Sequence, residues 1–127
     1  MVPVTTTTAI FLGIWLCWLS ARVIRARGTE GISLGAGDNE LLERRIRGQA
    51  NLSEYGPTAL ILLFLAEFQG ANFWALVVLA ALLVVGRLIH GIAFSFTDKW
   101  VFGRVGGMIM TFTAIMALAF LNIWTMI

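Results

Sequence analysis

The residues with the clearest capacity for chemistry lie in the segment "RRIRGQANLSEY", residues 44–55, directly before an apolar run. At about 100° per residue, a helix gathers most of these polar side chains in one stripe. The stripe contains Arg47, Asn51, Glu54 and Thr58, with Arg44 and Tyr55 at its edges. Polar groups at membrane depth are costly, which indicates a functional site facing a bundle interior or a wet cavity. Polar contacts that hold helices together are the alternative explanation.

A second polar group lies in "GRLIHGIAF", where Arg87, His90 and Phe94 share a helix face at three- and four-residue spacing. An arginine inside an apolar helix needs a partner. We expect Glu54 to form a structural ion pair with Arg87, because it is the intramembrane acid at comparable depth on the neighbouring antiparallel helix. For His90, a structural role and a ligand-binding role are both open.

Arg104 lies just before the last apolar segment. An arginine at such a position usually anchors a helix end at the membrane surface. It also adds to the cations that converge on one membrane edge beside Asn51, Glu54 and Tyr55. Such a site suits a small polyanionic ligand together with an amphipathic co-substrate that arrives from the bilayer.

The composition indicates a membrane protein. Hydrophobic residues make up 59% of the 127 residues and charged residues 13%, with a mean hydropathy of +0.88, outside the range of soluble globular domains. Four stretches are long enough to cross a hydrocarbon core, which takes about 20 apolar residues. They are residues 4–21, 52–70, 73–92 and 105–127. We predict an all-α integral membrane protein in which residues 1–127 form a single four-transmembrane-helix bundle.

Short signals predict the ends and contacts of these helices. Asp38 or Asn39 can cap the second helix, and the short second connection makes the second and third helices antiparallel neighbours. Glycines at the start of the last helix permit close helix contact. These are Gly103, Gly106 and Gly107. The single cysteine, Cys17, gives no disulfide or metal-ligand spacing and is expected to be buried.

The distribution of cations predicts the orientation. Lys and Arg flank the first and third connections, the latter with Lys99 and Arg104, and are absent from the second connection and both termini. By the positive-inside rule, the first and third connections face the cytoplasm and both chain ends face the periplasm. The N-terminus lacks the basic region of a cleavable signal peptide, so the first segment should remain as a helix. The net charge of +2 is too small to indicate a nucleic acid as partner.

The segment "RGQANLSEY" resembles the helix-two signature of the membrane-associated proteins in eicosanoid and glutathione metabolism, the MAPEG family. The matching residues are Arg47, Gln49, Asn51, Ser53, Glu54 and Tyr55. "GRLIHGIAF" is similar to the helix-three motif of the microsomal glutathione transferase-like branch, except that Phe94 stands where a tyrosine is usual. The resemblance covers nearly the whole chain. It implies a homotrimer of four-helix bundles that binds glutathione between adjacent subunits, near the cytoplasmic side.

The resemblance also implies roles for individual residues. Glutathione, the implied cofactor, would be held by Arg25, Arg47, Gln49, Asn51, Glu54, Tyr55 and His90. Arg104 matches the arginine that the family associates with the thiol and is the expected catalytic residue. A nearby cation favours the nucleophilic thiolate; lowering the thiol pKa by about 2 units from about 8.5 corresponds to about 2.7 kcal/mol. The thiolate would attack a hydrophobic electrophile dissolved among the membrane lipids.

Two functions follow from this pattern. The leading prediction is a membrane glutathione transferase or peroxidase. Because Phe94 removes one phenolic donor, the alternative is a non-catalytic trimer of the same fold that serves as a lipid-binding or accessory subunit of a larger membrane assembly. A transporter is a weaker third option, since the chain shows no inverted repeat. The small size and short loops fit a bacterial inner membrane.

Overall fold

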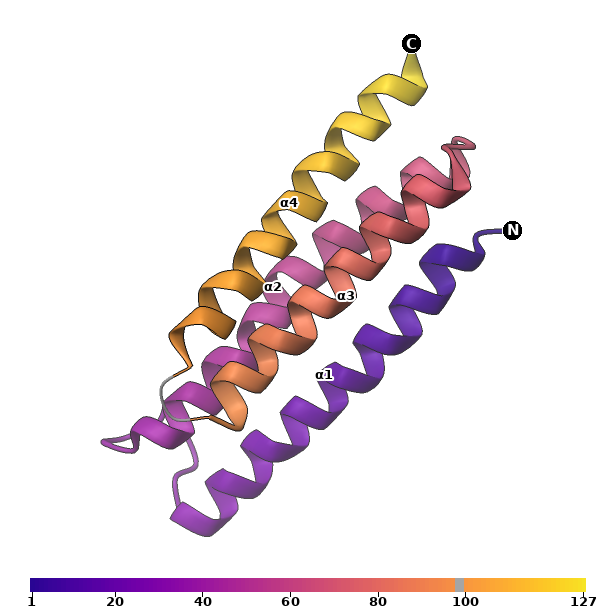
Figure 1. Cartoon of the computed structure of the whole chain (residues 1–127). Helices are drawn as coiled ribbons and strands as arrows, with labels where there is room; N and C mark the ends of the chain where they lie inside the picture. Colours follow the sequence, from indigo (N-terminus) through magenta and orange to yellow (C-terminus); the bar gives the residue numbers. More distant parts are fainter. Residues whose placement is uncertain (98–99) are drawn as a thin grey trace.

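The computed structural model describes residues 1–97 and 100–127, and in these residues the chain forms four antiparallel helices (Figure 1). They are α1 (Pro3–Glu30), α2 (Glu40–Phe68), α3 (Phe73–Ser95) and α4 (Val101–Met126). The predicted all-α four-helix architecture is therefore confirmed. The helices extend beyond most of the predicted apolar stretches, because capping and turn residues set their ends. Lys99, one of the cations used to predict the orientation, lies outside the described residues.

The middle of the bundle is formed by α2 and α3, and α1 and α4 flank this pair on opposite sides (Figure 1). In the described parts of the chain, α1 packs on α2 and α3, α4 packs on α3 and α2, and α1 does not touch α4. Both termini lie at the end where α2 turns into α3. The first connection, the end of α3 and the start of α4 lie together at the opposite end, which we call the loop end.

Three of the described helices, α1, α3 and α4, are long and apolar enough to cross a membrane. The helix α2 is also long, but its first half is polar, and Glu54 and Glu67 interrupt the rest. Composition therefore does not support the predicted span 52–70 on its own. Within the bundle, α2 contacts each of the other three helices.

Side chains and glycines set the helix ends. Asn39, one of the two predicted caps, accepts a hydrogen bond at its side-chain oxygen from the N–H of Leu42 at 2.9 Å. Asn72 caps α3 in the same way, accepting from the N–H groups of Trp74 and Ala75. At the end of α1, Gly31 takes a left-handed conformation (φ 67°), which glycine adopts without steric cost.

The first turn of α1 is held by a carboxylate from another helix. Glu67 on α2 accepts hydrogen bonds from the backbone N–H groups of Val4 at 2.8 Å and Thr5 at 2.7 Å. The residue before α1, Val2, offers no capping side chain. Because free N–H groups at a helix start are costly in a bilayer, Glu67 both satisfies them and ties α1 to α2.

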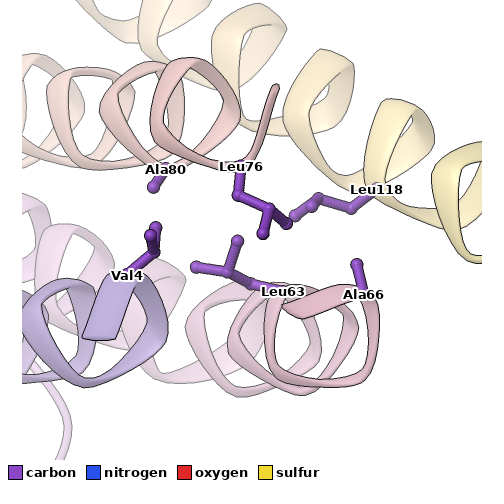
Figure 2. Close-up of a cluster of buried hydrophobic side chains, with 6 residues drawn as sticks. All are labelled: Val4, Leu63, Ala66, Leu76, Ala80 and Leu118. Atoms are coloured by element: carbon purple, nitrogen blue, oxygen red, sulfur yellow. The ribbon is translucent and has the colours of Figure 1, made fainter. Parts of the chain in front are cut away.

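The core consists of small and branched aliphatic side chains. At the end that carries the termini, one cluster joins residues from all four helices (Figure 2). It consists of Val4, Leu63, Ala66, Leu76, Ala80 and Leu118. A second cluster nearer the middle includes Leu12, Leu52, Leu83 and Ala114. The prediction that Cys17 is buried is wrong: its side chain is exposed on α1, since α1 has neighbours on only one side.

Two glycines allow α3 and α4 to approach closely. A Cβ atom on Gly107 would lie 2.6 Å from the carbonyl oxygen of Gly86 and 2.7 Å from Cβ of His90. The predicted close helix contact is thus confirmed for Gly107. Within the chain, Gly106 has open space around it, and Gly103 faces the ring of the nearby Trp100.

We predict that Gly107→Ala lowers the free energy of unfolding by about 1–3 kcal/mol, because an added methyl group would force α3 and α4 apart. Gly106→Ala is the matched control and should be neutral or slightly stabilising, since its Cβ meets nothing within 4 Å. Thermal unfolding of the two variants in the same detergent measures the difference. Equal melting temperatures would show that the helices do not depend on this contact.

Candidate functional site

An open groove of about 500 Å³ lies between α2, α3 and α4 toward the loop end. Its polar side chains come from three helices: Asn51 from α2, His90 from α3 and Arg104 from α4. The rest of the lining is apolar and consists of Phe94, Val101, Val105, Met108, Ile109 and Phe112. The groove is therefore amphipathic, with a cationic part and an apolar wall that continues along α4.

The aromatic ring of Phe94 organises the cationic part of the groove. The guanidinium carbon of Arg104 lies 4.3 Å from the ring centroid, and the His90 ring centroid lies 4.8 Å from it. His90 is almost fully buried, with 3% of its surface exposed. A cation held over an aromatic face keeps its N–H groups free at the edges. Arg104 is thus positioned to meet an anionic group in the groove.

The stripe on α2 borders this groove. The side-chain amide of Asn51 donates to the carbonyl oxygen of Arg47 at 3.2 Å. Tyr55 is half-buried, and its ring packs edge-on against Phe112, a lining residue, at 5.3 Å between centroids. Arg47 and Glu54 are exposed. The structure therefore brings four predicted site residues around one groove: Asn51, Tyr55, His90 and Arg104.

Arg87 is the largest fully buried side chain, with 2% of its surface exposed. Its guanidinium donates to the carbonyl oxygen of Asn51 at 3.2 Å and to the sulfur of Met108 at 3.1 Å. Within the described residues it forms no ion pair with Glu54, so that prediction is wrong. Glu54 is exposed on the outer face of α2, whereas Arg87 points into the bundle, where a backbone carbonyl can accept its N–H groups.

Two other predicted ligands, Arg25 and Gln49, lie away from the groove. The side chain of Gln49 donates to Ser53 at 3.2 Å, and Ser53 lines the cleft between α1 and α2. Gln49 and Asn51 are two residues apart, which places them about 200° apart around the helix. Arg25 lines a separate pocket of about 260 Å³ at the loop end, which we call the arginine pocket. Its lining is Arg22, Arg25, Ala26, Thr29 and Arg45.

Sequence reasoning missed the arginines that hold the C-terminal end of α3. Arg22 donates to the carbonyl oxygen of Ser95 at 2.7 Å. Arg44 donates to the carbonyl oxygens of Ala93, at 3.3 Å, and Thr97. The last turn of α3 has no basic residue of its own, so cations from α1 and α2 neutralise its negative end. The lack of a basic residue in the last turn of α3 was the sequence feature that could have indicated these contacts.

Comparison with known proteins gives a family and two relatives. The family model described as "MAPEG family" matches residues 5–124. The inner membrane protein YecN of Escherichia coli strain K12 is 29% identical over 123 residues, which is 97% of this chain and 92% of the relative. YecN of Escherichia coli O6:H1 shows the same identity and coverage.

We predict that Arg87→Lys lowers the free energy of unfolding by about 1–3 kcal/mol. A lysine has one ammonium group in place of a fork, so it cannot reach Asn51 and Met108 together while buried. Arg27→Lys is the control, because Arg27 lies near the surface and donates to a single carbonyl, that of Gly35. Thermal unfolding of both variants measures the effect, and equal loss in the two would contradict a bridging role for Arg87.

Proposed function

The chain belongs to the MAPEG family, and on that premise we propose that it is a membrane glutathione transferase or peroxidase that acts on lipophilic electrophiles. In this proposal it works as a homotrimer, with one glutathione site between each pair of adjacent copies. The site would use the groove of one copy and the opposite face of the next.

The division of the predicted ligand residues between two faces is the observation that supports this proposal. Asn51, His90 and Arg104 share the groove between α2, α3 and α4. Gln49 lies toward α1, and Arg25 lies in the arginine pocket. A helix with its side chains is about 10–12 Å across, so a tripeptide cannot contact both faces of one bundle. In a cyclic trimer, one face of each copy meets the other face of its neighbour.

The two faces together offer the groups that glutathione requires. Arg47 and Arg104 can bind carboxylates, and Arg25 adds a third guanidinium from the neighbouring face. The exposed carboxylate of Glu54 can accept from the ammonium group. The amides of Asn51 and Gln49 match the peptide units. The polar residues present therefore fit the tripeptide in charge and in hydrogen-bonding capacity.

Arg104 is the proposed thiol-activating residue. Glutathione, when bound, supplies a thiol whose sulfur can form a bond to an electrophilic carbon. The Arg104 guanidinium stabilises negative charge on a group held in the groove. Phe94 has no hydroxyl, so it acts by holding Arg104 in place, with 4.3 Å between the guanidinium carbon and the ring centroid. The wall of Val105, Ile109 and Phe112 would receive the second, lipophilic substrate.

A second function is favoured by the same contact. Because Phe94 supplies no phenolic donor and the Arg104 cation lies against its ring, the groove can also hold an amphipathic lipid without activating a thiol. The protein would then be the lipid-binding or accessory subunit of a larger membrane assembly.

We also propose an inner-membrane location in a bacterium, with the loop end in the cytoplasm and both termini in the periplasm. The distribution of arginines along the chain supports this orientation. The relative YecN carries "inner membrane protein" in its name, which supports the location.

A mixed assembly tests the shared site. We predict that Asn51→Ala and Gln49→Ala each abolish tight glutathione binding when all three copies of the trimer carry the same substitution. Because the two residues lie on different faces, each mixed trimer of the two variants should regain one intact site of its three, so about a third of the sites should bind. Differently tagged chains, purified in tandem and titrated by calorimetry, give the number of sites.

The control is co-assembly of Asn51→Ala with Arg47→Ala. These residues share one helical stripe, so every site keeps a defect and no binding returns. Recovery in this control, or none in the test pair, would contradict a site built from both faces.

The role of Arg104 is tested separately. We predict that Arg104→Gln lowers the ratio of bound thiolate to bound thiol at pH 7 at least tenfold, which corresponds to about 1.4 kcal/mol, while the affinity for glutathione falls less than about threefold. Arg104→Lys should keep part of the thiolate because it keeps the cation. Ultraviolet difference absorbance measures the thiolate. Equal loss of thiolate and affinity would make Arg104 a binding residue only.

A further inference from the structure

The arginine pocket is a second concentration of positive charge, outside the groove. Arg22 and Arg25 on α1 and Arg45 on α2 line its volume of about 260 Å³ at the loop end, and the Thr29 hydroxyl is the other polar side chain in the lining. All charged groups of the pocket are therefore guanidinium groups.

Within the part of the chain that the structure describes, these cations have no counter-charge. Across residues 1–97 and 100–127, no carboxylate pairs with Arg22, Arg25 or Arg45. The Nε atoms of Arg22 and Arg45 are buried without a hydrogen-bond partner, and these two cations lie close enough to repel each other. Bringing like charges together and leaving their donors unused is unfavourable, so an anion that bridges them would stabilise the pocket.

Arg22 is held in position before any anion arrives. One of its terminal nitrogens donates to Ser95 at 2.7 Å, and its guanidinium carbon lies 3.8 Å from the centre of the Phe96 ring. Its other terminal nitrogen donates no hydrogen bond in the described part of the chain. A fixed guanidinium loses little conformational entropy on binding and matches the geometry of a phosphate.

The face of α1 below the pocket is apolar. Trp18 and Phe11 follow Arg25 toward the N-terminus at intervals of seven residues, which places them on the same side of the helix. They are 56% and 59% exposed. One leaflet of hydrocarbon is about 15 Å deep, or about ten residues of helix, so an acyl chain attached to a group in the pocket would run along Trp18 toward Phe11.

We propose that the arginine pocket binds a phosphate group, and that the headgroup of an anionic membrane lipid is its main source. The pocket contains no acceptor for an ammonium group, unlike the proposed glutathione site. Basic pockets between helix ends at the membrane surface are suited to such headgroups. Arg25 could serve either site, so the test uses Arg45, which has no part in the proposed glutathione site.

The test titrates the full-length protein in neutral detergent with dihexanoyl phosphatidylglycerol and follows thermal unfolding. Dihexanoyl phosphatidylcholine, with the same chains and no net charge, is the lipid control. Glycerol 3-phosphate and inorganic phosphate, at matched ionic strength, test whether a soluble phosphate serves equally well. We expect saturable stabilisation by phosphatidylglycerol, and weaker stabilisation by the soluble phosphates because they lack the chains.

Arg45→Gln should reduce the affinity for phosphatidylglycerol about tenfold, as expected for loss of one charged hydrogen bond. Arg27→Gln is the matched control: it removes the same charge near the loop end but does not line the pocket, and it should change the affinity less than twofold. Equal effects of the two variants, or equal stabilisation by phosphatidylcholine, would overturn the proposal. Soluble phosphates that bind as tightly as the lipid would keep the phosphate site and reject the lipid as its source.

Glutathione binding by Arg45→Gln separates this proposal from the proposed function. The lipid proposal predicts that the Arg45→Gln variant binds glutathione with unchanged affinity. Displacement of phosphatidylglycerol by glutathione, with loss of both in the variant, would assign the pocket to the tripeptide and overturn the lipid proposal. Loss of lipid binding alone supports the lipid proposal, whether or not the protein uses glutathione.

Discussion

One buried guanidinium group constrains this bundle more than any other side chain. Arg87 lies in an apolar helix with 2% of its surface exposed, where an unsatisfied charge would be very costly. It therefore needs acceptors from its neighbours, and it finds them on both sides, in the carbonyl of Asn51 on α2 and the sulfur of Met108 on α4. Its own carbonyl accepts from the Trp15 indole on α1 at 3.3 Å. A single residue of α3 is thus tied to all three other helices.

These ties determine the shape of the groove. Asn51 and Met108, the partners of Arg87, are both lining residues, so the buried charge fixes two walls at once. Close contact at Gly86 and Gly107 brings α4 against α3. This contact lies one turn from Arg104 and helps to place its guanidinium over Phe94. The polar residues in the apolar helices therefore contribute both to helix packing and to the site. The sequence left two explanations open, a functional site and polar contacts between helices. Both apply, to neighbouring atoms of the same residues.

The architecture could be predicted from the sequence, and most interhelical contacts could not. Long apolar stretches predicted the helices, and Asn39 was a sequence-local cap. The partner of Arg87 could not be predicted, because a backbone carbonyl carries no signature in side-chain types. The separation of Gln49 from Asn51 follows from helical periodicity, but a motif written in sequence order places them together. The exposure of Cys17 depends on α1 lying at the flank of the bundle, and no local pattern specifies that position.

The central claim is that the protein binds glutathione between copies of the chain and activates its thiol. The most direct test is a titration of the purified, unmodified protein with glutathione at pH 7. Ultraviolet difference absorbance is recorded during the same titration. The proposal predicts saturation at one glutathione per subunit with a thiolate signal that grows in step with binding. Absence of saturable binding would contradict it and favour the accessory-subunit function, whereas binding without thiolate would remove the catalytic role of Arg104.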